Sequence, residues 1–190
     1  MDAGLLVLRA VMGLLVAGHG VQKVSFRLGG HGLAGGTEEF RHDGFRGGRL
    51  TAVVAGASQI GAGLFLAAGL LTPLAAMAAM GVMTVAGTVK WRHGLWVQND
   101  GYEYPLVLVV VSGALALTGP GRWSLDQALG LPAWPWWVVL PAIAAGPVSG
   151  LLTRAVLHRP VTGGPAADGA ATPGGGPAQP RTPAQPRTPA

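Results

Sequence analysis

An arginine stands inside an apolar segment near the start of the chain. Arg9 is the one charged residue within residues 4–22, which have the length and composition of a membrane span. A charge at that depth costs about 2.5 kcal/mol or more if it faces lipid, so Arg9 is expected to face other helices or extend toward the outer head groups. The functional hypothesis is a site for an anion or a quinone oxygen. The structural alternative is a hydrogen bond to another helix. At helical spacing Arg9 shares one stripe with Gly13, Val16, Gly20 and Lys23.

The same segment ends in a polar cluster of His19, Gln22 and Lys23. A histidine at this position can donate to a quinone carbonyl, pass a proton, or hydrogen bond to backbone carbonyls at the helix end. No acidic residue within the apolar segments pairs with Arg9, so a ligand is a candidate for the missing counter-charge. We therefore expect Arg9 and His19 to line one polar cavity within the membrane, supported by Gln59, Lys23 and Glu103.

Two further polar positions lie in or beside apolar segments. Gln59 falls within residues 51–71, on a stripe with glycines that is expected to pack against the Arg9 stripe. An interhelical hydrogen bond, worth about 0.6 kcal/mol, is its ordinary role, and a ligand contact is the alternative. Tyr102 and Glu103 precede residues 104–118, where a helix N-terminus favours a carboxylate. Glu103 either caps that helix or pairs with basic residues at the same end of the spans.

The sequence offers no thiol centre and no metal-ligand spacing. It contains no cysteine, which excludes a thiolate nucleophile, a dithiol relay, thiolate-held iron–sulfur clusters and disulfides. His31, His42 and His93 fall in polar segments without metal-ligand spacing, so no metal is expected. Residues 30–35 match Gly-x-Gly-x-x-Gly, but they follow an apolar helix instead of a strand, so we interpret them as a flexible turn. Redox chemistry would need a bound quinone or a partner subunit.

Five apolar segments are expected to position these residues as transmembrane helices. Only 11% of the residues are charged, against about 25% in a soluble domain, so most of the surface is expected to face the lipid bilayer. Thr72-Pro73 predicts a tight turn between the second and third segments. The fold class is therefore an all-α integral membrane helix bundle. The expected spans are residues 4–22, 51–71, 73–89, 104–118 and 134–157.

The remaining segments are polar or of low complexity. Within residues 23–50, Thr37 is expected to cap a short surface helix that runs to Phe45, with Phe40 and Phe45 in the interface. From residue 161 the chain is mainly Gly, Pro, Ala, Gln, Arg and Thr, a composition that predicts a disordered tail. The expected domains are a four-helix core at 1–130, an additional transmembrane helix at 131–160 and the tail at 161–190.

Lysine and arginine predict the orientation in the membrane. With five spans, nine of these residues fall on the side that holds residues 23–50 and 90–103, and only Arg122 falls on the other. Basic residues favour the cytoplasmic side, so we expect a multi-pass plasma-membrane protein with its N-terminus outside and its C-terminus in the cytoplasm. The net charge of +5 does not indicate nucleic-acid binding, because the basic residues are spread between apolar segments.

Several motifs resemble the DoxX family of bacterial membrane proteins. The first apolar segment, with its ending His-Gly-Val-Gln-Lys at 19–23, is similar to that family's opening helix. Asn-Asp-Gly-Tyr-Glu-Tyr-Pro-Leu at 99–106 is close to its Asn-Gly-Gly-Tyr-Glu-Tyr-Pro motif. The glycine-rich residues 29–35 and the segment 119–126 are similar in the same order, so the resemblance covers residues 4–129.

The resemblance implies a four-helix core, to which the fifth segment and the tail are additions. The family commonly has a glutamate where this chain has Gln59. A few family members, paired with another subunit, are thiosulfate:quinone oxidoreductases, and others are membrane partners of redox and detoxification enzymes.

The resemblance therefore leaves two functions open. One is a membrane subunit of a quinone- or sulfur-linked redox system that acts with a soluble or membrane partner on the cytoplasmic face. The other is a non-catalytic scaffold that docks a soluble enzyme there. A small transporter is disfavoured, because the chain has no clear inverted repeat.

Overall fold

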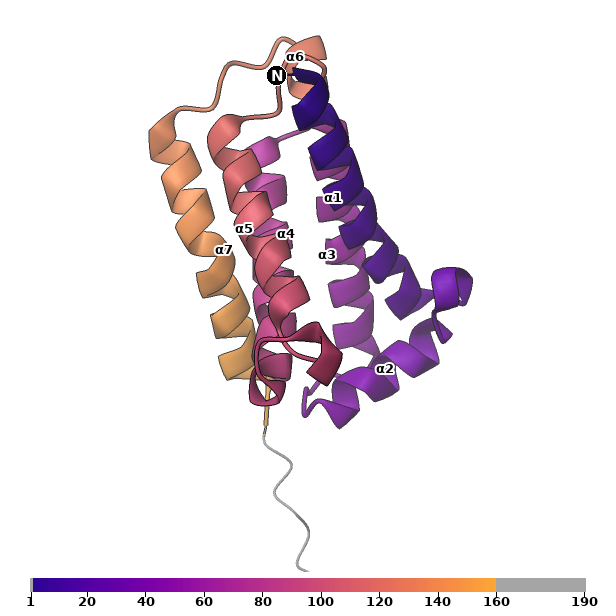
Figure 1. The fold of residues 1–190 in the computed structure, drawn as a ribbon. Helices are drawn as coiled ribbons and strands as arrows, with labels where there is room; N and C mark the ends of the chain where they lie inside the picture. Colours follow the sequence, from indigo (N-terminus) through magenta and orange to yellow (C-terminus); the bar gives the residue numbers. More distant parts are fainter. Residues whose placement is uncertain (1, 160–190) are drawn as a thin grey trace, which may run out of the picture. The chain divides into compact units, whose positions relative to one another are not determined.

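The computed structural model describes residues 2–159, which form an all-α bundle (Figure 1). Its long helices are α1 (Asp2–Val24), α3 (Arg49–Ala68), α4 (Thr72–Lys90), α5 (Glu103–Thr118) and α7 (Trp136–Leu157). The short elements are α2 (Gly32–His42), α6 (Leu125–Ala128) and the 3-10 turns η1 (Arg27–Gly29), η2 (Trp91–His93) and η3 (Val97–Asn99). The predicted all-α class is confirmed, and the predicted tail at 161–190 lies outside the described residues.

Four of the long helices are long and apolar enough to cross a membrane: α1, α3, α4 and α7. Helix α5 has 16 residues, which at 1.5 Å per residue gives a length of about 24 Å. The hydrocarbon core is about 30 Å thick. Helix α5 nevertheless packs beside α4 and runs between the same two ends of the bundle (Figure 1). The protein is a multi-pass membrane protein, and the crossing by α5 stays a prediction.

Large apolar side chains cover the outside of the bundle, whereas its centre mixes small and large ones. Val11, Leu14, Val54, Val110 and Leu152 are all more than half exposed. An exposed apolar surface of this extent suits lipid and not water. About half of the buried hydrophobic residues are alanines, and the others are larger side chains such as Leu66, Met80, Leu108 and Leu115.

Glycines allow α1 and α3 to pack backbone against backbone. A Cβ atom added at Gly20 would lie 2.6 Å from the Gly56 carbonyl oxygen, and one added at Gly13 would lie 2.7 Å from the Ala67 Cβ atom. Both distances are far inside van der Waals contact. The predicted packing of the two glycine stripes against each other is therefore confirmed.

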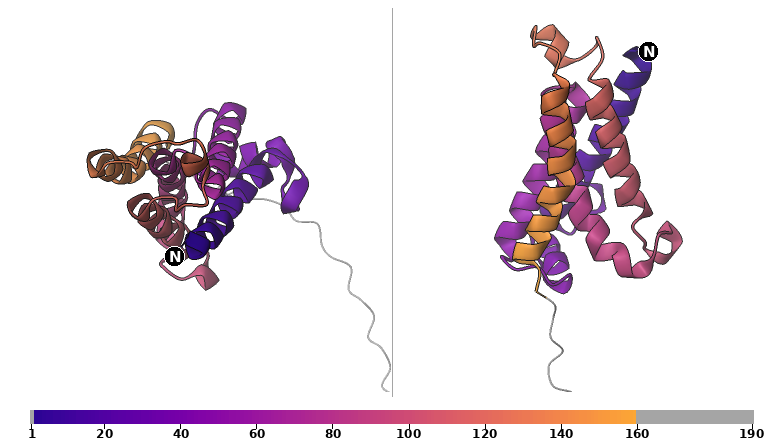
Figure 2. Two further views of the ribbon diagram at one scale, coloured as in Figure 1. Left: turned by 90° about the horizontal axis from the view of Figure 1, so that it is seen from above. Right: turned by 90° about the vertical axis from the view of Figure 1, so that its left-hand side faces the viewer.

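The other half of the bundle is α4 with α5 and α7, and the view from above shows it beside the α1–α3 pair (Figure 2). Helix α7 approaches α4 through Gly146, where an added Cβ atom would lie 2.8 Å from the Met80 Cβ atom. The two halves are joined by a tight turn, in which Gly69 has φ 66° and Pro73 opens α4. This turn was predicted from Thr72-Pro73.

Helix α2 packs against both α1 and α3 at the end of the bundle where α4 and α7 finish (Figure 1). It begins at Gly32, so the prediction that Thr37 caps this helix is wrong: Thr37 lies inside it and donates its hydroxyl to the Leu33 carbonyl. Phe45 is buried and does not enter the interface. Its ring packs edge-on against Phe40 at 5.8 Å and His158 at 5.5 Å between centroids.

Candidate functional site

The two buried polar positions predicted on α1 lie at opposite ends of the bundle. Arg9 is near the N-terminal end of α1, and His19 is ten residues further along, which corresponds to about 15 Å of helix. The Arg9 end, where α3 meets α4 and α5 meets α6, contains Arg122. Apart from Arg9, Arg122 and the two arginines within residues 161–190, all Lys and Arg residues, nine in number, belong to elements at the His19 end (Figure 1). We call these the arginine end and the basic end. Arg9 and His19 border different cavities, so the structure does not bring them together.

Arg9 is 3% exposed and uses all three guanidinium nitrogens as donors. Nε donates to the Ala67 carbonyl at 3.2 Å, Nη1 donates to the Pro120 carbonyl and Nη2 donates to the Trp123 carbonyl. The guanidinium also lies against Gly69, where an added Cβ atom would be 2.6 Å from Nη1. Arg9 therefore ties α1 to the end of α3 and to the α5–α6 connection.

Two acids complete the arginine end. Asp126 is buried and accepts from the backbone N–H of Leu71 at 2.8 Å and from the Trp134 indole N–H at 3.2 Å. Asp2 accepts from the backbone and side-chain N–H groups of Arg122 at 3.0 and 2.9 Å. A wide, shallow depression of about 760 Å³ borders Arg9 and residues 122–125. Since the donors of Arg9 are engaged with backbone carbonyls, this end resembles a structural clamp.

His19 is held between two side chains. Gln22 Nε2 donates to the Leu28 carbonyl at 2.7 Å, so Gln22 Oε1 faces His19 Nδ1 at 3.0 Å and must accept from it. In a neutral ring Nε2 is then an acceptor, and the Tyr104 hydroxyl, 2.9 Å away, donates to it. The ring is thereby fixed in the tautomer with its proton on Nδ1. The hydrogen bonds form a chain from Leu28 in η1, through Gln22 and His19 in α1, to Tyr104 in α5.

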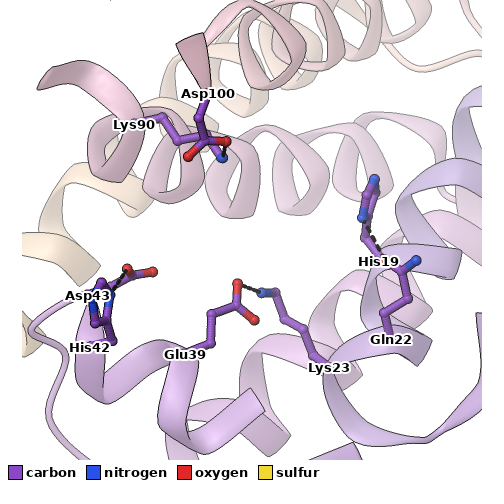
Figure 3. A network of polar contacts seen from close by, with 8 residues as sticks. All are labelled: His19, Gln22, Lys23, Glu39, His42, Asp43, Lys90 and Asp100. Atoms are coloured by element: carbon purple, nitrogen blue, oxygen red, sulfur yellow. Dashed lines mark hydrogen bonds and ion pairs between the residues drawn. The ribbon is translucent and has the colours of Figure 1, made fainter. Parts of the chain in front are cut away.

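A cavity of about 380 Å³ lies beside this histidine, between the end of α1, η1 and α2. His19, Gln22, Lys23, His31 and Glu39 border it with their side chains. Figure 3 shows Lys23 reaching across from α1 to Glu39 on α2, where Nζ donates to Oε1 at 2.8 Å. The ammonium also lies 5.0 Å from the centroid of the Phe40 ring.

Glycines form the rest of the cavity wall, and they let α2 approach the end of α1. A Cβ atom added at Gly30 would lie 2.8 Å from the Gln22 Cα atom, and one added at Gly36 would lie 3.2 Å from the Lys23 carbonyl carbon. Gly32 has φ 67° and starts α2. The Gly-x-Gly-x-x-Gly segment is therefore a tight connection that continues into a helix, and its interpretation as a flexible turn is corrected.

Three predicted site residues lie away from this cavity. Tyr102 stacks on Trp91 at 4.8 Å between centroids, and Glu103 Oε2 accepts from the Val97 backbone N–H at 3.0 Å. Both organise the α4–α5 connection. Gln59 is buried on α3 against Gly20 of α1, and its Oε1 has no hydrogen-bond partner among the described residues. The interhelical hydrogen bond expected of it is not formed by that oxygen.

Tyr104 is the residue that sequence reasoning missed. From the sequence it was included only as the first residue of the apolar segment 104–118. Successive residues on a helix point about 100° apart, and Tyr104 points into the bundle toward His19. Its place in the Asn-Asp-Gly-Tyr-Glu-Tyr-Pro motif was the available signal. Within residues 2–159, no three His, Asp or Glu side chains gather closely enough to hold a metal ion.

Comparison with known proteins identifies the family. Residues 4–91, which span α1 to α4, match the family model DoxX, while the 99–106 motif lies outside the matched range. No curated protein and no solved structure matched the chain. The family match and the apolar helices together show that residues 4–91 form a domain of the DoxX family of membrane proteins.

Proposed function

We propose that this chain is the membrane subunit of a quinone-linked redox system and that the cavity beside His19 binds the quinone head group. The observation that carries the proposal is His19 itself, fixed in one tautomer by Gln22 and Tyr104 at the edge of the cavity. The cavity volume of about 380 Å³ falls in the range of roughly 300–1,000 Å³ that small-molecule pockets occupy.

The residues around the cavity fit a ligand with carbonyl oxygens. Lys23 has three N–H donors, of which Glu39 takes one at 2.8 Å, and His31 borders the same space. A bound quinone would supply the electron-carrying chemistry. His19 would hold or pass a proton at Nε2, the atom that accepts from Tyr104. Tyr104 acts through His19 and is a positioning residue.

Charge balance favours a neutral head group over a sulfur oxyanion. The ammonium of Lys23 is ion-paired with Glu39, so the cavity does not present an uncompensated cation. At the arginine end the guanidinium of Arg9 donates to carbonyl groups, which are the usual partners of a structural arginine. A thiosulfate-like anion would need a free positive charge at the site, and the quinone does not.

The proposal includes a partner and an orientation. The chain has no cysteine, so we propose that a separate redox protein exchanges electrons with the bound quinone. The cavity lies at the basic end, for which the distribution of Lys and Arg predicts the cytoplasmic side of the plasma membrane. The partner would therefore dock on the cytoplasmic face.

Binding of decylubiquinone to the purified full chain in detergent tests the site. His19→Ala should weaken binding by about fivefold to tenfold, since it removes a ring that borders the cavity and releases Gln22 and Tyr104, each of which loses a hydrogen bond worth about 1 kcal/mol. His42→Ala is the matched control, because that ring is on α2, outside the cavity, and 88% exposed. Equal affinity in both variants would place the quinone elsewhere.

A non-catalytic scaffold is the second candidate. It is favoured by the charge of the basic end, which gathers nine Lys and Arg residues against five acids in the described residues. Such a surface suits an acidic soluble enzyme. If the parent protein neither retains quinone on purification nor binds decylubiquinone, the scaffold function is the better one.

A further inference from the structure

Two segments that are far apart in the sequence join at the basic end. The backbone N–H of Arg46 donates to the Leu157 carbonyl at 2.8 Å, and the backbone N–H of Arg159 donates to the Gly44 carbonyl at 2.9 Å. Phe45 and His158 form a bridge between them and pack their rings together. The connection before α3 is thereby fixed to the end of α7.

Four arginines lie on the two segments that this junction joins. Arg46 and Arg49 come from the connection and the first residue of α3, while Arg154 and Arg159 flank the end of α7. We call these four residues the arginine junction. None of them forms an ion pair within residues 2–159. Asp43, the nearest acid in sequence, instead lies 3.6 Å from His42 Nδ1. Among residues 2–159, the junction therefore has four positive charges and no ion-paired counter-charge.

Arg154 shows that the charge is not simply left to water. The residue is only partly exposed, and its Nη1 atom is buried without a hydrogen-bond partner among the described residues. Leaving a buried charged donor unsatisfied costs more than the roughly 1–3 kcal/mol of a neutral group. A phosphate at the end of α7 would meet the accessible part of the guanidinium and balance its charge.

We propose that the arginine junction binds the phosphate of an acidic phospholipid. The junction lies at the end of two apolar helices, α3 and α7, which is the level at which lipid head groups meet the protein. Guanidinium groups match phosphate oxygens in a two-pronged geometry, and basic sites between membrane helices recognise acidic head groups. The site does not depend on the cavity beside His19 or on quinone chemistry.

The test compares phosphatidylglycerol with phosphatidylcholine on the purified full chain, with native mass spectrometry measuring the lipid-bound fraction. The parent should retain phosphatidylglycerol in preference. Arg46→Gln should lower that retention by about fivefold, the loss expected for one basic residue at an anionic surface. Its side chain is exposed and its backbone hydrogen bond stays, so the variant should fold. Arg154→Gln should lower retention by at least as much.

Arg27→Gln is the matched control, because this exposed arginine lies at the same end in η1, away from the junction. It should change retention by less than about twofold, since the Debye length is about 8 Å at physiological ionic strength. Equal losses for Arg27→Gln and Arg46→Gln would overturn the site and leave only general attraction. The lipid assignment would be overturned if the parent retained the two lipids equally. It would also be overturned if sodium phosphate bound the parent as well as phosphatidylglycerol does.

Discussion

The two ends of this bundle each contain a polar α1 side chain in an apolar setting, and they use it differently. At the arginine end, all three nitrogens of Arg9 donate to backbone carbonyls, and Asp126 and Asp2 are also fully engaged. At the basic end, the bonds of His19 to Gln22 and Tyr104 fix its ring beside a cavity.

The difference lies in what satisfies each group. A polar side chain in a membrane protein must find partners, because lipid offers none. Three chain segments meet around Arg9, and their turns present free carbonyls to it, so the protein itself satisfies the guanidinium. Around His19 the glycines of η1 and α2 keep side chains away, and space for a ligand remains. The charged residue in the span is therefore satisfied within the protein, whereas a cavity remains beside the glycine-lined turn.

The largest difference expected between the two ends is in access from outside the cell. Gln98 in η3 at the basic end and Gln127 in α6 at the arginine end are both exposed, and the chain has no cysteine. Gln127→Cys should react with an impermeant thiol reagent in intact cells, and Gln98→Cys should react only after lysis. Ser124 is less suited to this test because it is buried. If only Gln98→Cys were labelled in intact cells, the protein would have the opposite orientation to the one predicted.

The second contrast is in stability. Arg9→Gln leaves backbone carbonyls without their charged donor, so the free energy of unfolding should fall by about 3 kcal/mol or more. Arg9→Lys should not restore it, because a single ammonium cannot reproduce the fork of a guanidinium. His19→Ala should cost about 1 kcal/mol while reducing quinone binding. Thermal unfolding in detergent measures all three, and an unchanged melting temperature for Arg9→Gln would show that the arginine is not a clamp.

The close contact of α1 with α3 links the two ends, and glycine variants test it. Gly63→Ala places a Cβ atom 2.9 Å from the Ala17 Cα atom, and this backbone contact cannot relax without separating the helices. We expect a loss of about 1–3 kcal/mol. Gly61→Ala, two residues away on α3, meets no atom within 4 Å and should be neutral or slightly stabilising. Equal melting temperatures for the two variants would contradict the packing.

The smallest expected effect is at the rim of the basic end, where Lys90 is hydrogen bonded to Asp100 (Figure 3). That bond, aided by His93, holds the pKa of Asp100 below its usual 3.8. The stabilisation is therefore fully present above the usual pKa and is lost as the pH falls through the lowered value. Because the pair is exposed, it should contribute less than about 1 kcal/mol.

Asp100→Asn is a suitable probe of this pair, because asparagine also tolerates the left-handed backbone at this residue, which has φ 58°. It should lower the melting temperature slightly at neutral pH and have no effect at pH values well below the lowered pKa. A difference that persists in acid would mean that the carboxylate charge is not the cause.

The helices themselves followed from local sequence. Three predictions depend only on neighbouring residues, and the structure confirms them: the apolar runs of near-spanning length, the tight turn at Thr72-Pro73, and the glycine stripes of α1 and α3. The start of α2 was misplaced at Thr37 because a capping side chain was assumed, whereas the helix begins at Gly32 through a backbone turn. Phe45 was wrongly expected in the interface. The contact with His158 that covers its ring joins residues over a hundred positions apart, so neighbouring residues do not reveal it.

The sequence alone determined that this protein is an all-α membrane bundle of the DoxX type, and it identified Arg9, His19, Gln22 and Lys23 as its unusual polar residues. Hydropathy and helical spacing are properties of short segments, so they are visible without a fold. Only the tertiary structure decided that Arg9 meets Pro120 and Trp123, that His19 meets Tyr104, and that Arg46 meets Leu157. Those partners come from remote parts of the chain, whose packing sets how each polar group is satisfied and where a cavity remains beside it.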